Sequence, residues 1–172
     1  MTDPQPGDFG LVKMGGETGR LIRLGQWLNG DGFADYEHAF VYAGDAGVGN
    51  ISHGIVEAEP GGARLLPLHY GDVLWSSGLI PLTAVQRRTI VQSAKRYVGT
   101  PYSFADYLAL AAHRLHIPAP GLRAYVASSG HQICSQLVDQ CYADAGVHLF
   151  SDGRWAGFVT PGDLYQLLQG AH

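Results

Sequence analysis

Two periodicities divide the chain. Most of its first half consists of short runs with the two-residue period of strands, separated by stretches rich in Gly, Asp and Asn that are typical of turns. Beyond residue 80 the apolar positions recur at the spacing of amphipathic helices. The predicted strands cover residues 9–14, 38–43, 55–59, 63–68 and 72–78.

Helix boundaries can be predicted from capping residues. Thr83 and Gln86 have the spacing of an N-terminal capping box for a helix that runs to Val98 and stops at Gly99. Thr160, Pro161 and Asp163 open a short last helix, because Pro is favourable at the first helical position. Further helices are predicted over residues 18–28, over residues 103–116 and around Cys134. We therefore expect an α+β fold, with an antiparallel sheet packed against helices in a single domain that covers residues 1–172.

Composition narrows the class of protein. With 172 residues, 46% hydrophobic and 15% charged, the chain has enough apolar residues for one real core. A net charge of −4 without any Lys/Arg cluster argues against a nucleic-acid partner. The apolar runs are too short for a transmembrane segment, and the start MTDPQPGDFG does not have the form of a signal peptide. We expect a cytoplasmic protein, or one exported or released by a non-classical route.

The segment SSGHQICSQLVDQCYADAG contains the candidate nucleophile. Small, turn-prone residues lead into an apolar stripe at helical spacing, and Gly146 is a natural stop, so Cys134 falls in the first turn of a helix. The positive end of the helix dipole there favours the thiolate, which is the nucleophilic form of cysteine. Cys141 follows seven residues later, on the order of 10 Å along the axis. That separation is beyond disulfide reach, and we expect Cys141 to be a core residue.

A candidate base lies upstream, in a predicted hairpin with an imidazole on one strand and carboxylates on the other. If the loop is symmetric, with Gly44 facing Ile51, His38 lies directly opposite Glu57, and a carboxylate beside an imidazole orients it as a base. A one-residue slip would move Glu57 to the other face. Glu59 shares the face of Glu57, and a shorter loop would make His53 the third member instead.

The runs HAFVYAGD, IVEAEPGG and ICSQLV, in this order, resemble the circularly permuted branch of the NlpC/P60 papain-like cysteine hydrolases. The opening PGDFGLVKM, the later LIRLGQWL and the segment YVGTPYSF are similar to the same family, so that the resemblance spans residues 6–168. In ordinary members the cysteine precedes the histidine, whereas here the order is His38, Glu57, Cys134. The resemblance implies a papain-like fold, with an antiparallel sheet or small barrel, and catalytic roles for these three residues.

A second permuted branch, similar to lecithin:retinol acyltransferase, carries His at the position of Glu57 and an Asn-Cys-Glu-His-like motif around the nucleophile. The sequence ICSQ departs from that motif, so the branch with Glu is the closer match.

Other residues have weaker claims to the site. The resemblance gives Tyr102 a place in the substrate cleft, although core packing explains it equally well. The backbone N–H of Cys134 or Ser135 is the natural oxyanion donor, and Gln132 could add a side-chain donor. His113 and His116 have the spacing of metal ligands, but no further ligand lies nearby in the sequence, so we expect no metal site.

The expected function is that of a thiol hydrolase that cleaves an amide bond in a peptide or peptidoglycan-type substrate through an acyl-enzyme on Cys134. This chemistry requires no metal or organic cofactor. A thioesterase, a lipid-ester hydrolase or acyltransferase, and a non-catalytic papain-like binding module are the alternatives.

Overall fold

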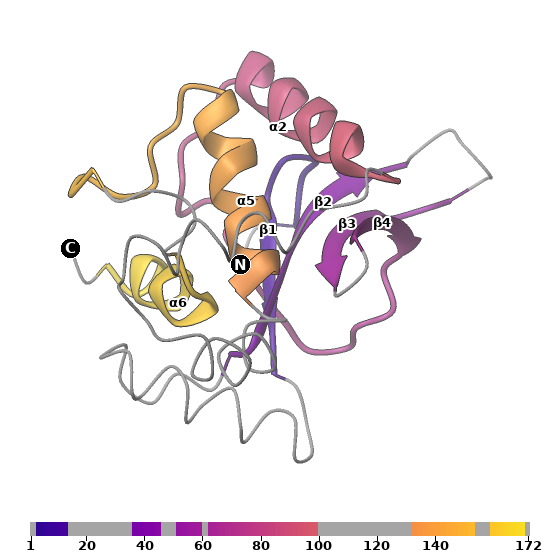
Figure 1. Cartoon of the computed structure of the whole chain (residues 1–172), viewed down its shortest axis with the longest axis horizontal. Helices are drawn as coiled ribbons and strands as arrows, with labels where there is room; N and C mark the ends of the chain where they lie inside the picture. The colour runs from indigo at the N-terminus through magenta and orange to yellow at the C-terminus, as the bar shows by residue number, and fades with distance from the viewer. Residues whose placement is uncertain are drawn as a thin grey trace, which may run out of the picture.

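The computed structural model describes residues 3–13, 36–45, 51–59, 62–99, 132–153 and 159–170. Their architecture is α+β, as predicted, with an antiparallel sheet and helices packed against it (Figure 1). The predicted helices over residues 18–28 and 103–116 lie outside the described residues. The elements are β1 (Phe9–Val12), β2 (His38–Gly44), β3 (Gly54–Glu59), β4 (Gly62–Pro67), β5 (Val73–Trp75), α2 (Ala84–Tyr97), α5 (Gln132–Asp144) and α6 (Pro161–Leu168).

The sheet has the strand order β4-β3-β2-β1-β5, and each neighbouring pair is antiparallel. Strand β1 ends at Val12, two residues earlier than predicted, where Val12 pairs with His38. Strand β2 is the central strand of the sheet: it pairs with β1 on one edge and with β3 on the other, and all seven of its residues are buried. This central position holds the first residue of β2, His38, in a fixed place at the end of the sheet.

The symmetric register predicted for the β2–β3 hairpin is wrong. Phe40 pairs with Glu57 and Tyr42 with Ile55, so β3 is displaced by two residues from the expected alignment. The cause is a longer connection, because Gly44 pairs with Gly54 and not with the predicted Ile51. An irregularity between Tyr42 and Gly44 then reduces this displacement from three residues to two. Because the displacement is an even number of residues, every side chain keeps its predicted face.

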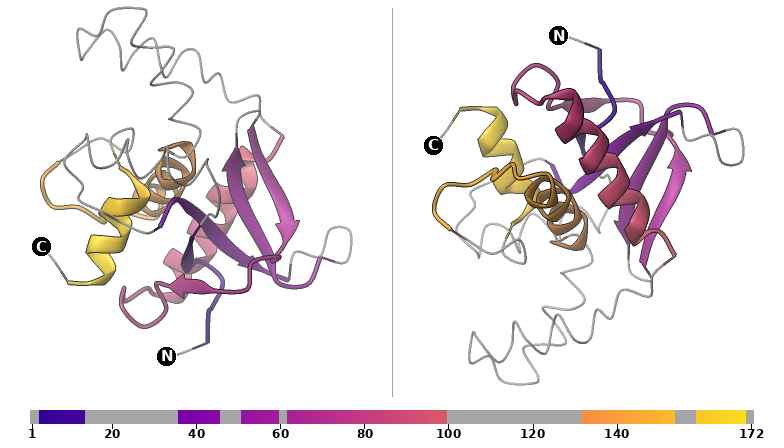
Figure 2. Two further views of the ribbon diagram at one scale, coloured as in Figure 1. Left: turned by 90° about the horizontal axis from the view of Figure 1, so that it is seen from below. Right: turned by 90° about the horizontal axis from the view of Figure 1, so that it is seen from above.

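The two faces of the sheet form separate apolar clusters. Residues of β2 and β3 that face the helices join residues of α2, α5 and α6 in the main core, with Ala39, Val41, Val56, Leu137 and Leu164 among its fully buried members. Helices α2 and α5 pack against each other, and both contact β2 (Figure 2). The opposite face carries a smaller cluster, with Phe40, Tyr42 and Ile55 covered in part by Tyr70 and Trp75.

The predicted helix caps are confirmed. Thr83 and Gln86 form a complete capping box at the start of α2, and Thr160 and Asp163 form one at the start of α6. Gly146, which follows α5, has a φ of 71°, a conformation that glycine adopts without steric cost. No helix among the described residues is long and apolar enough to cross a membrane.

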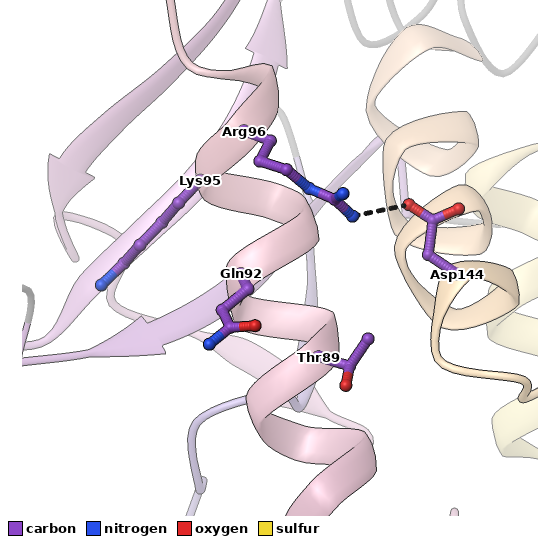
Figure 3. A pocket seen from close by; sticks show the side chains of 5 residues that line it. All are labelled: Thr89, Gln92, Lys95, Arg96 and Asp144. Atoms are coloured by element: carbon purple, nitrogen blue, oxygen red, sulfur yellow. Dashed lines mark hydrogen bonds and ion pairs between the residues drawn. The ribbon is translucent and has the colours of Figure 1, made fainter.

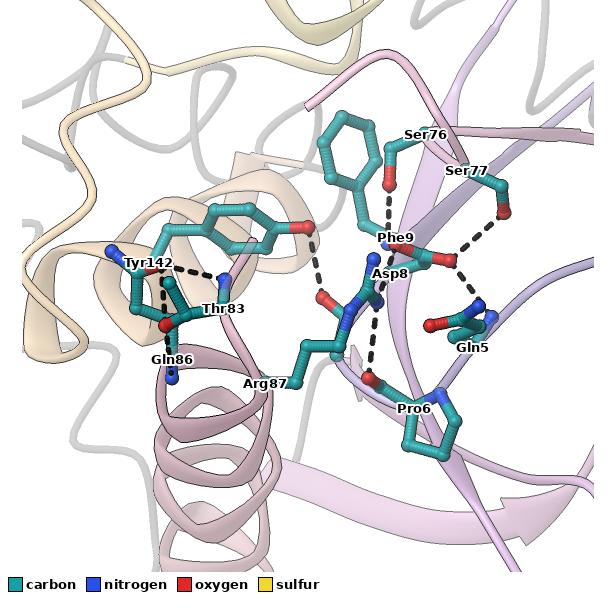
Figure 4. Close-up of polar contacts among 11 residues, drawn as sticks. Gln5, Pro6, Asp8, Phe9, Ser76, Ser77, Thr83, Gln86, Arg87 and Tyr142 are labelled. Atoms are coloured by element: carbon teal, nitrogen blue, oxygen red, sulfur yellow. Dashed lines mark hydrogen bonds and ion pairs between the residues drawn. The ribbon is translucent and has the colours of Figure 1, made fainter. Parts of the chain in front are cut away.

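Buried polar contacts tie the N-terminal segment to the helices (Figure 4). Asp8, which is 1% exposed, accepts a hydrogen bond from Arg87 Nη1 at 2.9 Å and another from Ser77 Oγ at 2.9 Å. The hydroxyl of Tyr142 on α5 donates to the carbonyl of Gly7 at 2.8 Å. These contacts hold the start of β1 against α2 and α5.

Candidate active site

Cys134 is the third residue of α5, in the first turn of the helix as predicted. The apolar side of α5 anchors that turn, because Leu137, Val138 and Cys141 are all fully buried in the main core. The Cys134 side chain is 0% exposed. The helix therefore presents the thiol to the interior of the molecule, against the sheet.

His38 and Glu57 meet on adjacent strands. Because Glu57 pairs with Phe40, His38 lies diagonally from Glu57 and not directly opposite it. Diagonal neighbours on one face are within reach of long side chains, and His38 Nε2 lies 2.9 Å from Glu57 Oε2. Both residues are buried, with exposures of 3% and 1%. The predicted register was therefore wrong, but the predicted contact between His38 and Glu57 is present.

The thiol of Cys134 forms a hydrogen bond with the ring of His38. Burial by itself lowers the pKa of the imidazole, but the charge interaction and hydrogen bond with Cys134, followed by those with Glu57, outweigh burial. Together they raise the pKa of His38 from its ordinary value of 6.5 to about 10. The imidazolium form is therefore favoured at neutral pH.

The contacts of the imidazole assign a role to each ring nitrogen. Ionised Glu57 can only accept hydrogen bonds, so His38 Nε2 is the donor of the 2.9 Å contact. Nδ1 remains as the nitrogen that can exchange a proton with the Cys134 thiol. The structure thus brings the three predicted residues together: the imidazole of His38 lies between the thiol of Cys134 and the carboxylate of Glu57.

Two residues that the sequence analysis missed also contact Glu57. The hydroxyl of Tyr70 donates to Glu57 Oε2 at 2.8 Å, and Arg64 Nη2 lies 3.6 Å from Oε1. Burial opposes ionisation of the carboxyl, but the hydrogen bonds from His38 and Tyr70 hold the pKa of Glu57 below its ordinary value. A signal for Arg64 was present in the short spacing between the two strands: Glu59 pairs with Gly62, and the antiparallel register then pairs Glu57 with Arg64.

Tyr70 had no comparable signal in the sequence. It belongs to the connection between β4 and β5, which returns over the sheet face that carries Phe40 and Glu57. The position of such a connection depends on tertiary packing, which the local pattern does not reveal.

Cys141 has a separate environment. It is fully buried, as predicted, and burial raises the pKa of its thiol to about 12, although the contact with Ser93 acts in the opposite direction. The Ser93 hydroxyl donates to Asp144, which Arg96 approaches from α2 (Figure 3). An open groove of about 660 Å³ between the two helices is lined by Thr89, Gln92, Lys95, Arg96 and Asp144. None of the three candidate catalytic residues lines this groove.

The weaker predictions have mixed outcomes. Tyr102, the side chain of Gln132, and the pair His113 and His116 lie outside the described residues. The described part of the chain contains no group of three or more His, Cys, Asp or Glu side chains arranged to hold a metal ion.

Ser135 and His53 are held by contacts outside the Cys–His–Glu trio. The hydroxyl of Ser135 is buried and donates to the carbonyl of Val159 at 2.6 Å. His53 Nδ1 lies 2.8 Å from the hydroxyl of Tyr42, and the backbone N–H of His53 donates to Asp45. His53 therefore does not replace Glu57 as the partner of His38.

Comparison with known proteins does not identify a family. A scan of the chain against protein-family models found no match, and a search of curated proteins found none either.

Proposed function

We propose that this protein is a papain-like cysteine hydrolase of the circularly permuted NlpC/P60 type, and that it cleaves an amide bond in a peptide or peptidoglycan-type substrate. The proposal rests on one observation: a thiol in the first turn of a helix contacts an imidazole, and that imidazole is hydrogen-bonded to a buried carboxylate. The family resemblance of the motifs around His38, Glu57 and Cys134 adds the substrate class.

The proposed reaction begins with the Cys134 thiolate beside the His38 imidazolium. The sulfur attacks the carbonyl carbon, and the carbonyl π electrons move to oxygen. Backbone N–H groups in the first turn of α5 stabilise that oxyanion, because helix-start amides point toward developing negative charge. The tetrahedral intermediate then collapses as the C–N bond breaks, and His38 Nδ1 gives its proton to the departing amine. A thioester on Cys134 remains.

Water completes the proposed cycle. Neutral His38 takes a proton from the water molecule at Nδ1 while the oxygen attacks the thioester carbonyl. The C–S bond breaks, the acid product leaves, and the thiolate–imidazolium pair is restored. Throughout the cycle His38 Nε2–H stays on Glu57, which keeps the ring oriented and supports its positive charge.

The first test measures which cysteine reacts. Cys134 and Cys141 are both 0% exposed, so exposure does not separate them, but only Cys134 contacts His38. Limiting iodoacetamide should therefore alkylate Cys134 well before Cys141, as read by peptide mass spectrometry. His38→Ala should remove this preference by slowing the reaction of Cys134. Equal labelling of the two thiols in the wild-type protein would argue against an activated nucleophile.

The second test is turnover. A screen of peptidoglycan fragments, acyl-peptides and phospholipids should yield a substrate that leaves an acyl adduct on Cys134. On that substrate Glu57→Gln should lower kcat by about 10- to 100-fold, because the imidazolium loses its negative partner. Glu59→Gln makes the same change two residues along β3 and should have a small effect. A binding module would show no adduct with any substrate, and a lipid-directed enzyme would form one only with the phospholipids.

A further inference from the structure

The Glu57 carboxylate receives two donors on one oxygen atom. His38 Nε2 lies 2.9 Å from Oε2, and the hydroxyl of Tyr70 donates to the same Oε2 at 2.8 Å. The other oxygen faces Arg64 at 3.6 Å. An ionised carboxylate oxygen can accept both bonds at once. The position of Oε2, and with it the direction in which His38 is held, therefore depends on the Tyr70 hydroxyl as well as on the strand.

The ring of Tyr70 is itself fixed. It stacks on Phe40 with ring centroids 5.4 Å apart and an interplanar angle of 13°, and its centroid lies 5.9 Å from that of His38. Phe40 is fully buried in the smaller core cluster, and Tyr70 packs against that cluster. Because packing already fixes the ring, its hydroxyl is a pre-organised hydrogen-bond donor, and no conformational entropy is lost in orienting it during the reaction.

We propose that Tyr70 is a positioning residue of this site, whose hydroxyl holds the Glu57 carboxylate where it receives His38 Nε2–H. The inference rests on the proposed function, in which His38 works on Cys134. In this role Tyr70 acts through Glu57 and His38. It provides the orientation of the carboxylate, whereas Glu57 provides the charge.

The test uses the pH dependence of Cys134 alkylation, which requires no substrate. The groups that face Glu57 are His38 on β2, Arg64 on β4, and His69 and Tyr70 in the connection after β4. Tyr70→Phe removes the hydroxyl and keeps the stacked ring. Without that hydroxyl the Glu57 carboxylate is no longer held where its Oε2 receives His38 Nε2–H, so the support for the imidazolium weakens. The rate of alkylation near pH 6 should fall about tenfold, with the rising limb displaced to higher pH.

A matched control lies on the same face of the sheet. Tyr42→Phe likewise removes one tyrosine hydroxyl that is bonded to a neighbouring side chain, but that side chain is His53 and not Glu57. It should leave the pH profile of Cys134 unchanged. Melting temperatures of both variants show whether the fold is intact.

A double variant separates positioning from a general loss of structure. In a Glu57→Ala background the Tyr70 hydroxyl has no carboxylate to hold, so adding Tyr70→Phe should change the alkylation profile no further. An equal tenfold effect with and without Glu57 would overturn the inference, as would a wild-type profile for Tyr70→Phe. If His38→Ala leaves the profile of Cys134 unchanged, the proposed function itself fails. If His38→Ala changes it and Tyr70→Phe does not, only the role of Tyr70 fails.

Discussion

His38 is a buried imidazole whose charge depends on its neighbours. Burial disfavours the imidazolium, and the pKa of His38 is nevertheless raised to about 10, because Cys134 contributes a charge interaction and a hydrogen bond and Glu57 contributes both as well. A raised pKa means that the ring keeps its proton as the pH rises through 6.5 and loses it only near 10. At neutral pH the ring is thus an acid ready to protonate a leaving group, as the proposed reaction requires.

Removing the sulfur should reveal the contribution of Cys134. In Cys134→Ala the charge interaction and hydrogen bond of the thiol are lost, while the effect of burial remains. The pKa of His38 should fall from about 10 toward its ordinary value of 6.5. An NMR titration of the imidazole nitrogens measures this directly. Cys141→Ala is the control, because Cys141 contacts Ser93 and not His38, and should leave the titration unchanged.

At the scale of single elements, predictions based on local chemistry were the most successful. The capping boxes at Thr83 and Thr160 involve residues three apart, so the sequence alone contains the whole interaction. The β2–β3 register involves the length of a connection, and no local pattern revealed the irregularity near Gly44. The predicted contact between His38 and Glu57 is present although the register was wrong. Strand alternation determines which sheet face each side chain is on, and a shift of two residues changes the cross-strand partner but not the face.

The first turn of α5 is also held to the start of α6, through the residue that follows Cys134. Ser135 Oγ donates to the carbonyl of Val159, directly before the Thr160 cap of α6. Ser135→Ala should therefore lower the free energy of unfolding by about 1 kcal/mol, the usual cost of a lost hydrogen bond. Chemical denaturation measures this cost.

The turnover of Ser135→Ala should stay near that of the wild type, because its hydroxyl is engaged with the backbone. Ser151→Ala, a variant at an exposed serine, provides the control for stability. A normal melting curve combined with lost turnover would show instead that the Ser135 hydroxyl takes part in the chemistry.

At the scale of the whole molecule, the candidate site depends on contacts between distant parts of the chain. Cys134 comes from a helix and His38 from a central strand, and the core places one against the other. Their residue types and local patterns, together with the family resemblance, predicted the three residues that the structure brings together. Tyr70 was not predictable, because its contact with Glu57 requires the whole sheet and a returning connection to be in place.

The N-terminal segment offers a test of this long-range dependence. Asp8 precedes β1 and is 1% exposed, and Arg87 of α2 reaches it with Nη1 at 2.9 Å while also donating to the carbonyl of Pro6. The Asp8–Arg87 contact joins residues that are 79 positions apart in the chain. Arg87→Met keeps much of the aliphatic stem and removes the charge, which leaves the buried Asp8 carboxylate with fewer donors.

Arg87→Met should lower the free energy of unfolding by about 2 kcal/mol, the range for a hydrogen bond to a charged group. The cost stays below that of an isolated buried charge because Ser77 Oγ and the backbone N–H of Gln5 still donate to Asp8. Arg88→Met, the same change at the exposed neighbouring position, should cost little. Asp8→Asn combined with Arg87→Met should cost less than the sum of the two single variants, since each removes the same contact. Urea denaturation of the four proteins measures the cycle, and strict additivity would mean that the Asp8–Arg87 pair does not stabilise the fold.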